Sequence, residues 1–212
     1  MAVGADYGPE AFRKQIGVSR ETLERLETYE KMLRRWQPTI NLVSRQSLAD
    51  VWRRHFLDSA QLFDLIPRNA RSLLDIGSGA GFPGLVLAIL GAKNVHLVES
   101  DQRKSTFLRE ASRETSTDVT IINARIESIS PQVFDVVTSR ACAALDVLLY
   151  YSKPYLGPET VCLFPKGQSV EAELTTARKR WNMRYTVVQS ASDSAGRIVR
   201  LEGIFDGLTT AD

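Results

Sequence analysis

Apolar positions recur in two different rhythms along the chain. Over residues 23–36 and again over 48–63 they follow three- and four-residue intervals, which is the period of an amphipathic helix. Ser19 and Ser47 precede these stretches and are predicted to be the N-caps of the two helices. The sequence therefore predicts a helical N-terminal segment over residues 1–68, packed on the remainder of the chain.

The second rhythm begins near residue 71 and consists of short apolar runs separated by helix-like stretches. The runs are expected to be strands, at 73–76, 95–98, 119–122, 134–138 and 161–164. The helix-like stretches lie at 84–90, 102–115, 145–151 and 170–181. Strands that alternate with helices indicate a parallel sheet covered on both faces. Two further runs, 185–189 and 197–205, have only a short polar link between them, so we expect a terminal antiparallel hairpin in an α/β domain over residues 69–212.

A glycine-rich loop joins the first predicted strand to the first helix of this domain. Residues 73–84 read Leu-Leu-Asp-Ile-Gly-Ser-Gly-Ala-Gly-Phe-Pro-Gly. Glycine lets a main chain turn tightly and approach a ligand closely, and open α/β sheets bind ligands at the carboxyl ends of their strands. The spacing of Gly79, Gly81 and Gly84 satisfies a dinucleotide-binding pattern, so a nicotinamide-dependent reductase is one interpretation.

Two acidic residues at strand ends bear on the identity of the cofactor. Asp75 lies two residues before Gly77, where a carboxylate repels a pyrophosphate and attracts a cation. S-adenosylmethionine carries a sulfonium and an ammonium group and no phosphate, so Asp75 favours it over a dinucleotide. Glu99 ends the second strand, and its carboxylate can accept hydrogen bonds from the ribose hydroxyls of either cofactor.

The composition is that of an ordinary globular protein, with 43% hydrophobic and 25% charged residues among 212. No apolar run approaches the ~20 residues that span a membrane, and the first ten residues lack the pattern of a signal peptide, so we expect a cytoplasmic protein with no membrane partner. Cys142 and Cys162 lie in unrelated segments and are expected to be small buried hydrophobes. No metal site is expected.

The net charge of +2 is distributed unevenly. Residues 1–30 carry six acids and four bases, whereas residues 31–54 carry six bases and one acid. Such a basic stretch is typical of a nucleic-acid face and equally of a solvated helix surface, so both interpretations stay open. A small-molecule methyltransferase also stays open, although the basic stretch argues mildly against it.

Six short stretches give the chain a specific resemblance. They are Asn41–Ser44, Arg54–Ser59, Asp75–Gly84, Arg125–Glu127, Thr138–Ala141 and Lys166–Gln168. In these stretches the chain resembles the RsmG/GidB family of bacterial 16S ribosomal RNA guanine-N7 methyltransferases. The resemblance implies a class I (Rossmann-like) methyltransferase fold with S-adenosylmethionine as cofactor. It also implies methyl transfer to a guanine in the decoding-region loop of the small-subunit RNA.

The resemblance further implies a set of cofactor contacts, at Gly77, Phe82, Ile126, Glu127 and Arg140. The glycine loop and its acids add further predicted cofactor-binding residues, namely Asp75, Gly79, Gly81 and Glu99. On the substrate side, Arg140, Lys166 and Arg200 are predicted to act in catalysis. Arg140 follows the fourth strand, where a class I fold opens its substrate cleft, and Lys166 and Arg200 are placed at the ends of late strands, where a phosphate or guanine O6 could be held. The expected partner is small-subunit ribosomal RNA, within the subunit or an assembly intermediate, bound by a monomer.

Guanine N7 suits an enzyme without a general base, because this nitrogen has a free lone pair and carries no proton. Such an enzyme can act by holding N7 in line with the methyl group. The sequence lacks the Asn/Asp-Pro-Pro-Tyr loop of exocyclic amine methyltransferases, and it lacks the Pro-Cys pair needed for C5 methylation of cytosine. A cofactor-binding RNA assembly factor without catalysis is a further alternative.

The helical segment supplies the remaining candidates. His55 and Asp58 lie on its second apolar stripe, and we expect them to be hydrogen-bonded structural residues beside the cleft. The cations of the basic stretch are predicted to surround one cleft mouth together with Lys166 and Arg200, near the end of the fourth strand. These cations are Arg34, Arg35, Arg45, Arg53 and Arg54.

Overall fold

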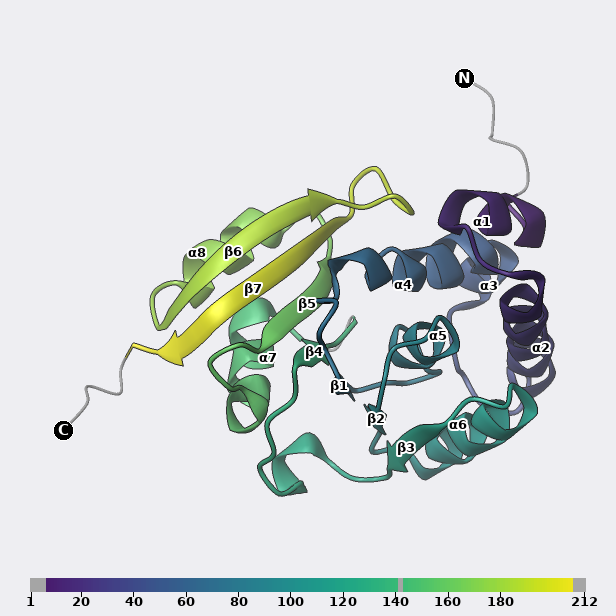
Figure 1. The fold of residues 1–212 in the computed structure, drawn as a ribbon, viewed down its shortest axis with the longest axis horizontal. Coiled ribbons are helices and arrows are strands. Elements are labelled where there is room, and N and C mark those ends of the chain that lie inside the picture. The colour runs from purple at the N-terminus through teal and green to yellow at the C-terminus, as the bar shows by residue number, and fades with distance from the viewer. Residues whose placement is uncertain (1–6, 141–142, 208–212) are drawn as a thin grey trace.

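The computed structural model describes residues 7–140 and 143–207 and is built around a seven-stranded sheet (Figure 1). The strand order is β3-β2-β1-β4-β5-β7-β6. The strands are β1 (Leu73–Ile76), β2 (Val95–Val98), β3 (Val119–Ile122), β4 (Val136–Thr138), β5 (Val161–Lys166), β6 (Trp181–Gln189) and β7 (Arg197–Asp206). Strands β1 to β5 are parallel, and β7 is antiparallel to both β5 and β6. The predicted α/β sheet with a terminal hairpin is therefore confirmed, and β6 forms the outer edge.

Helices cover both faces of the sheet, as the near-continuous apolar strands predict. The α-helices are α1 (Pro9–Ile16), α2 (Arg20–Trp36), α3 (Arg45–Ala49), α4 (Asp58–Ala60), α5 (Gly84–Ile89), α6 (Gln102–Glu114), α7 (Leu145–Ser152) and α8 (Val170–Ala177). Shorter turns are the π-helix η1 (Trp52–Leu57) and the 3₁₀ turns η2 (Phe63–Leu65), η3 (Ile126–Ser128) and η4 (Lys153–Tyr155).

Two hydrophobic cores lie on opposite faces of the sheet, because successive strand residues point to opposite sides. Leu73 of β1 belongs to the core shared with α1, α2, α5 and α6, whereas Leu74 belongs to the core shared with α7 and α8. Cys162 is fully buried in the second core, as predicted, and this burial raises the pKa of its thiol. Cys142 lies outside the described residues. Side chains from both sides of residue 68 share the first core, and the division of the chain there stays a prediction.

The N-terminal segment differs in detail from its predicted two helices. Ser19 caps α2 as predicted, with its hydroxyl accepting from Thr22 N at 3.1 Å. The prediction for Ser47 is wrong, because Ser44 caps α3 and Ser47 lies inside that helix. The expected single helix over 48–63 is instead α3, η1 and α4 in succession. An apolar stripe with helical spacing does not distinguish these forms, since a π-turn inserts one extra residue without removing the stripe.

The boundary between α8 and β6 also differs from its prediction. The helix expected to reach residue 181 ends at Ala177, and Trp181 instead begins β6, paired with Asp206 of β7. Trp181 is buried in the second core, so its apolar side chain continues the helical pattern while it packs from a strand. Tertiary pairing decides this boundary.

Candidate functional site

A cavity of about 1070 Å³ lies at the carboxyl ends of the parallel strands. Five segments line it: the glycine loop after β1, the N-terminal segment over 42–58, Arg140, Ala143 and Ala144 after β4, the end of β5 with the residues after it, and the link between β6 and β7. Lys104 of α6 and Glu173 of α8 complete the lining. This is the edge of an open α/β sheet at which ligands bind. The fold brings these segments together from widely separated parts of the sequence.

The glycine loop presents its main chain to this cavity. Gly77 and Gly79 both line it, and Gly79 has a φ of +58°. A Cβ built on Gly79 would have only Gly77 O within 4 Å, at 3.9 Å, so the space above this residue is open to a ligand. Gly81 is different: its Cβ would lie 2.6 Å from Tyr29 Oη and 3.1 Å from Leu108 Cδ2. Gly81 therefore lets α2 and α6 approach the loop, and it does not line the cavity.

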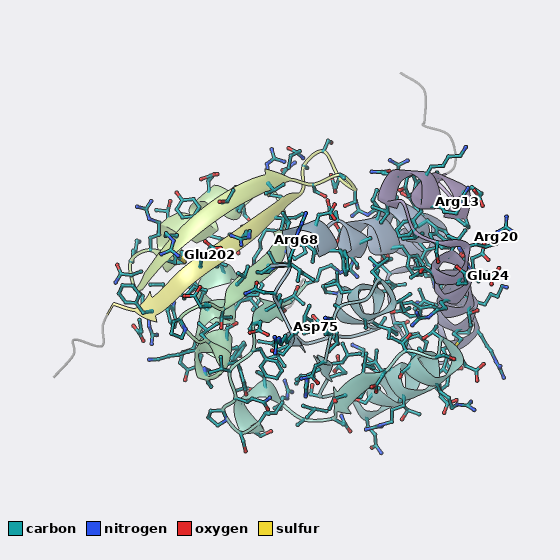
Figure 2. The ribbon with its side chains drawn as sticks, viewed as in Figure 1. Arg13, Arg20, Glu24, Arg68, Asp75 and Glu202 are labelled. Atoms are coloured by element: carbon teal, nitrogen blue, oxygen red, sulfur yellow. The ribbon has the colours of Figure 1, made fainter. Side chains whose placement is uncertain are left out.

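The two predicted acids lie behind the loop. Asp75 is fully buried near the middle of the molecule (Figure 2), and its Oδ2 accepts from Gly84 N at 3.1 Å while its Oδ1 has no partner. Burial raises the pKa of Asp75 from 3.8 to about 7. Because Asp75 holds the start of α5 and does not line the cavity, the prediction that it directly faces a cationic ligand at the strand tip is not supported by its position.

Glu99 fixes the shape of the same loop. Its Oε2 accepts from Gly79 N at 2.8 Å, and its Oε1 accepts from Asp101 N at 2.7 Å. Asp101 is the N-cap of α6. The carboxylate predicted to take ribose hydroxyls is thus already bonded to two main-chain amides, one of which belongs to the cavity-lining Gly79.

Arg140, two residues after β4, is held in the cavity by the N-terminal segment. Its Nη2 lies 2.7 Å from His55 Nδ1, and its Nη1 donates to Asp58 Oδ2 at 3.2 Å. A guanidinium group only donates, so His55 Nδ1 accepts, and His55 Nε2 carries the proton that it donates to Ser47 Oγ at 2.9 Å. Burial, assisted by the charges of Arg140 and Arg54, lowers the pKa of His55 from 6.5 to about 3. His55 and Asp58 are therefore hydrogen-bonded residues that hold Arg140, and both line the cavity.

Phe82 forms the floor beneath this cluster. Phe82 is 3% exposed, and its ring stacks on the His55 ring with centroids 4.8 Å apart. The Arg140 guanidinium lies 5.1 Å from the Phe82 centroid, within the range of a cation–π contact. Phe82 lines the cavity, and it also packs the π-helix against the glycine loop; its predicted contact with the cofactor stays a prediction.

Lys166 ends β5 and lines the cavity, but its charge is paired. Its Nζ donates to Ala143 O at 2.7 Å and lies 2.9 Å from Glu173 Oε2. Glu173 also accepts from Leu145 N at 2.9 Å. The side chain of Lys166 is 8% exposed, so in this structure it ties the segment after β4 to α7 and α8.

The predicted placement of Arg200 at a strand end is wrong. Arg200 lies within β7, pairs with Glu202 and does not line the cavity. The cavity-lining cation of this strand is Arg197, the first residue of β7, which lies opposite Lys166. The sequence reasoning missed Arg197, although an antiparallel hairpin places the start of its last strand beside the end of the strand it joins.

Other predicted residues lie away from the cavity lining. Ile126 is buried, with its carbonyl accepting from Tyr155 Oη at 2.7 Å, and Glu127 is exposed on η3. Of the six cations in residues 31–54, all of which the structure describes, Arg54 alone lines the cavity. Of the cations predicted to surround one cleft mouth, only Arg54 and Lys166 line the cavity, and Lys104, Arg140 and Arg197 line it as well.

Two further properties concern the part of the chain that the structure describes. Across residues 7–140 and 143–207, no group of three or more His, Cys, Asp or Glu side chains is arranged to hold a metal ion. None of the helices within these ranges is long and apolar enough to cross a membrane.

Sequence comparison identifies the family. The family model described as "rRNA small subunit methyltransferase G" (GidB) matches residues 22–199. The chain belongs to this family. Two relatives named ribosomal RNA small subunit methyltransferase G are each 53% identical to the chain. The relative from Paramagnetospirillum magneticum covers 94% of this chain and 98% of its own length, and that from Rhodospirillum rubrum covers 91% and 96%.

Comparison with solved structures agrees on the fold. The ribosomal protein L11 methylase from Lactobacillus delbrueckii subsp. bulgaricus superposes with a TM-score of 0.60 at 13% identity, covering 78% of this chain and 82% of that one. A mutant of MtNAS in complex with S-adenosylmethionine gives a TM-score of 0.58 at 16% identity, covering 94% and 80%. The predicted class I methyltransferase fold of this family member is confirmed.

Proposed function

We propose that the protein transfers a methyl group from S-adenosylmethionine to N7 of a guanine in the decoding-region loop of 16S ribosomal RNA. The observation that carries the proposal is the family match over residues 22–199, which includes every segment that lines the cavity. The relatives do not favour the alternatives of a nicotinamide-dependent reductase or a non-catalytic assembly factor.

The cavity fits S-adenosylmethionine. The open space above Gly79, which a Cβ would enter, leaves main-chain atoms of the loop accessible to a ligand. When bound, this cofactor supplies an activated methyl group on a positively charged sulfur. We propose that Gly77, Gly79 and Phe82 contact the cofactor, and that Asp75 and Glu99 act through the loop that they hold. The contacts predicted for Gly81, Ile126 and Glu127 lie outside the cavity lining and stay predictions.

The residues of this chain act by orientation. Because guanine N7 has no proton to lose, holding it in line with the methyl group supplies the main rate advantage. The Arg140 guanidinium donates hydrogen bonds to His55, Asp58 and the Arg54 carbonyl. These bonds fix its orientation, so its remaining N–H groups point in a fixed direction. We propose that Arg140 positions the guanine, while Arg54 and Arg197 hold RNA phosphates at the rim.

Three narrower statements belong to the same proposal. The protein acts as a monomer, in the cytoplasm, on RNA within a ribosomal subunit or an assembly intermediate. The net charge of +2 supports a preference for folded RNA, because a weakly basic protein gains little affinity for free RNA from counterion release. Shape then contributes more of the recognition.

The test is labelled methyl transfer to unmethylated small-subunit RNA, offered both naked and as the subunit, followed by mapping of the modified base. We expect one labelled guanine, modified at N7. Arg140→Ala serves as the control that keeps the glycine loop but removes the positioned cation. Absence of transfer to either substrate, with S-adenosylhomocysteine bound normally, would reject the proposed reaction.

A further inference from the structure

A basic and aromatic surface lies outside the cavity, at the turn from α8 to β6. Three consecutive cations, Arg178, Lys179 and Arg180, are all exposed there. Two tyrosines flank them: Tyr150 on α7 is 55% exposed and Tyr185 on β6 is 41% exposed. The site already described uses none of these residues.

Each tyrosine is paired with an arginine of the turn. The guanidinium of Arg180 lies 5.7 Å from the Tyr150 ring centroid, and that of Arg178 lies 5.7 Å from the Tyr185 centroid. These contacts hold the rings at the surface while much of each ring stays open to solvent. The exposed part of each tyrosine ring can stack on a further flat group, such as a nucleic-acid base.

The charge of this surface points to a polyanion. Arg180 and Lys153 share one acid, Asp206, at 2.8 and 3.0 Å. Among residues 7–140 and 143–207, neither Arg178 nor Lys179 forms an ion pair, so their positive charges are available to a bound anion. A surface that places free cations beside exposed aromatic rings is typical of proteins that bind single-stranded nucleic acid, where cations meet phosphates and rings stack on bases.

We propose that Tyr150, Lys153, Arg178, Lys179, Arg180 and Tyr185, here called the α8–β6 surface, form a second contact for the ribosomal RNA substrate. The inference rests on the proposed function for the identity of the RNA. Its partner is a single-stranded segment of the same RNA whose target guanine occupies the cavity.

The position of the α8–β6 surface sets the length of RNA that can reach it. Because β7 is antiparallel to both β5 and β6, β6 runs parallel to β5, and the turn before β6 lies at the end of the sheet opposite the cavity. The nine residues of β6 span about 26 Å at ~3.3 Å per residue. At ~3.4 Å per stacked nucleotide, an RNA must extend about eight nucleotides beyond the cavity to touch both places.

The test compares long and short RNA with a charge-matched control. The variant Arg178→Ala/Lys179→Ala removes two free cations of the α8–β6 surface. The control Lys14→Ala/Arg20→Ala removes two exposed cations from α1 and α2, at the other end of the long axis, where Figure 2 labels Arg20. Each protein is titrated with long small-subunit RNA and with a short stem-loop that holds the target guanine, across a salt series, and KM is measured for both.

We expect the α8–β6 variant to show a KM about tenfold higher on the long RNA and unchanged on the stem-loop. The slope of its log affinity against log salt should fall by about 1.4, since two phosphate contacts are lost at ~0.7 each. S-adenosylhomocysteine affinity and melting temperature should match the wild type. Tyr150→Ala, a surface change on α7, should weaken long-RNA binding by about fivefold or more through lost stacking.

Several outcomes overturn the inference. They are wild-type KM and salt slope for both surface variants on long RNA, an equal loss in the control, or an equal loss on the stem-loop. If neither RNA is methylated by the wild type while the surface variant still loses affinity for long RNA, the proposed function fails and the α8–β6 surface stands. A surface that binds a ribosomal protein but not RNA would leave every RNA affinity unchanged and so also count against it.

Discussion

The glycine loop and the N-terminal segment line the same cavity with different kinds of group. The loop offers main-chain atoms at Gly77 and Gly79 and is held from behind by Asp75 and Glu99. The N-terminal segment offers side chains, and His55 and Asp58 hold Arg140, which follows β4. One wall is a local structure with a local sequence signal, whereas the other depends on residues 85 positions apart.

The two walls therefore differ in which substitutions they tolerate. A binding surface made of main-chain atoms is blocked by an added side chain, so it requires glycine, but it depends on no side-chain functional group. A side-chain network tolerates replacements that keep the same donors and acceptors. The loop is therefore suited to the constant cofactor, and the N-terminal segment to holding Arg140 in the orientation proposed for the substrate contact.

The largest effect is expected at the loop. Gly79→Val should abolish detectable S-adenosylhomocysteine binding, because its branched side chain enters the open space above the loop and φ at this residue is +58°. Isothermal titration measures the affinity and urea unfolding the stability. The matched control is Gly17→Val, which imposes the same kind of backbone strain at φ +77°, outside the cavity, and costs roughly 1–2 kcal/mol of stability.

Gly17→Val should bind S-adenosylhomocysteine normally once folded. Near-normal affinity in folded Gly79→Val would show that the loop is not the binding surface for the cofactor. An equal loss of affinity in both variants would assign the effect to backbone strain.

The second effect is a pair of opposite pH dependences of stability. Asp75 has a pKa raised from 3.8 to about 7, so the stability it contributes at low pH is lost as pH rises from about 4 to 7. His55 has a pKa lowered from 6.5 to about 3, so its contribution is present above pH 6.5 and lost as pH falls toward 3. Each change is on the order of 4 to 5 kcal/mol at ~1.36 kcal/mol per pH unit.

Single variants separate these two contributions. Relative to wild type, Asp75→Asn should lose less free energy of unfolding between pH 4 and pH 7, and His55→Asn should lose less between pH 6.5 and pH 4. Urea unfolding at pH steps of one-half measures both. Parallel curves for wild type and either variant would contradict the burial argument for that residue.

A smaller effect is expected from the contact between His55 and Arg140. His55→Ala removes the acceptor at Nδ1 and should lower kcat for methyl transfer about tenfold or more, the scale of a hydrogen bond to a charged group. His55→Asn places an amide oxygen near the Nδ1 position and should recover most of the rate. S-adenosylhomocysteine affinity should stay within about twofold for both, so a matching loss of rate in both variants would indicate a purely structural role.

The smallest effect separates two neighbouring arginines. Arg54 lines the cavity beside Asp193, whereas Arg53 lies over the Tyr7 ring at 4.8 Å, outside the lining. Arg54→Gln should reduce the slope of log RNA affinity against log salt by about 0.7, and Arg53→Gln should leave it unchanged. Stability should change by less than about 1 kcal/mol in Arg54→Gln, because its ion pair is exposed. Equal slopes for the two variants would remove Arg54 from the RNA rim.

The sequence alone was sufficient wherever the signal is local. Alternating apolar runs predicted β1 to β5 and the helices between them, since each run reports burial of its own residues. The short polar link predicted the terminal hairpin, and the glycine spacing after β1 pointed to the loop whose Gly77 and Gly79 line the cavity. The six matching stretches indicated the family before any contact was known.

Tertiary structure decided the contacts between distant segments. Gly81 was indistinguishable from Gly79 in the sequence, but it faces Tyr29 of α2 instead of the cavity. Arg197 and Arg200 are three residues apart, and the register of β7 against β5 places Arg197 beside Lys166 at the cavity.

The same limit applies to charge and to His55. A sequence shows a lysine but not its partner, so Lys166 looked free until Glu173 was found beside it. The π-turn at η1 brings His55 to Arg140, and no periodicity within residues 48–63 specifies that meeting. Local patterns determine which residues are buried and where the chain turns, whereas partners at long sequence separation are determined by packing, because each contact depends on both segments at once.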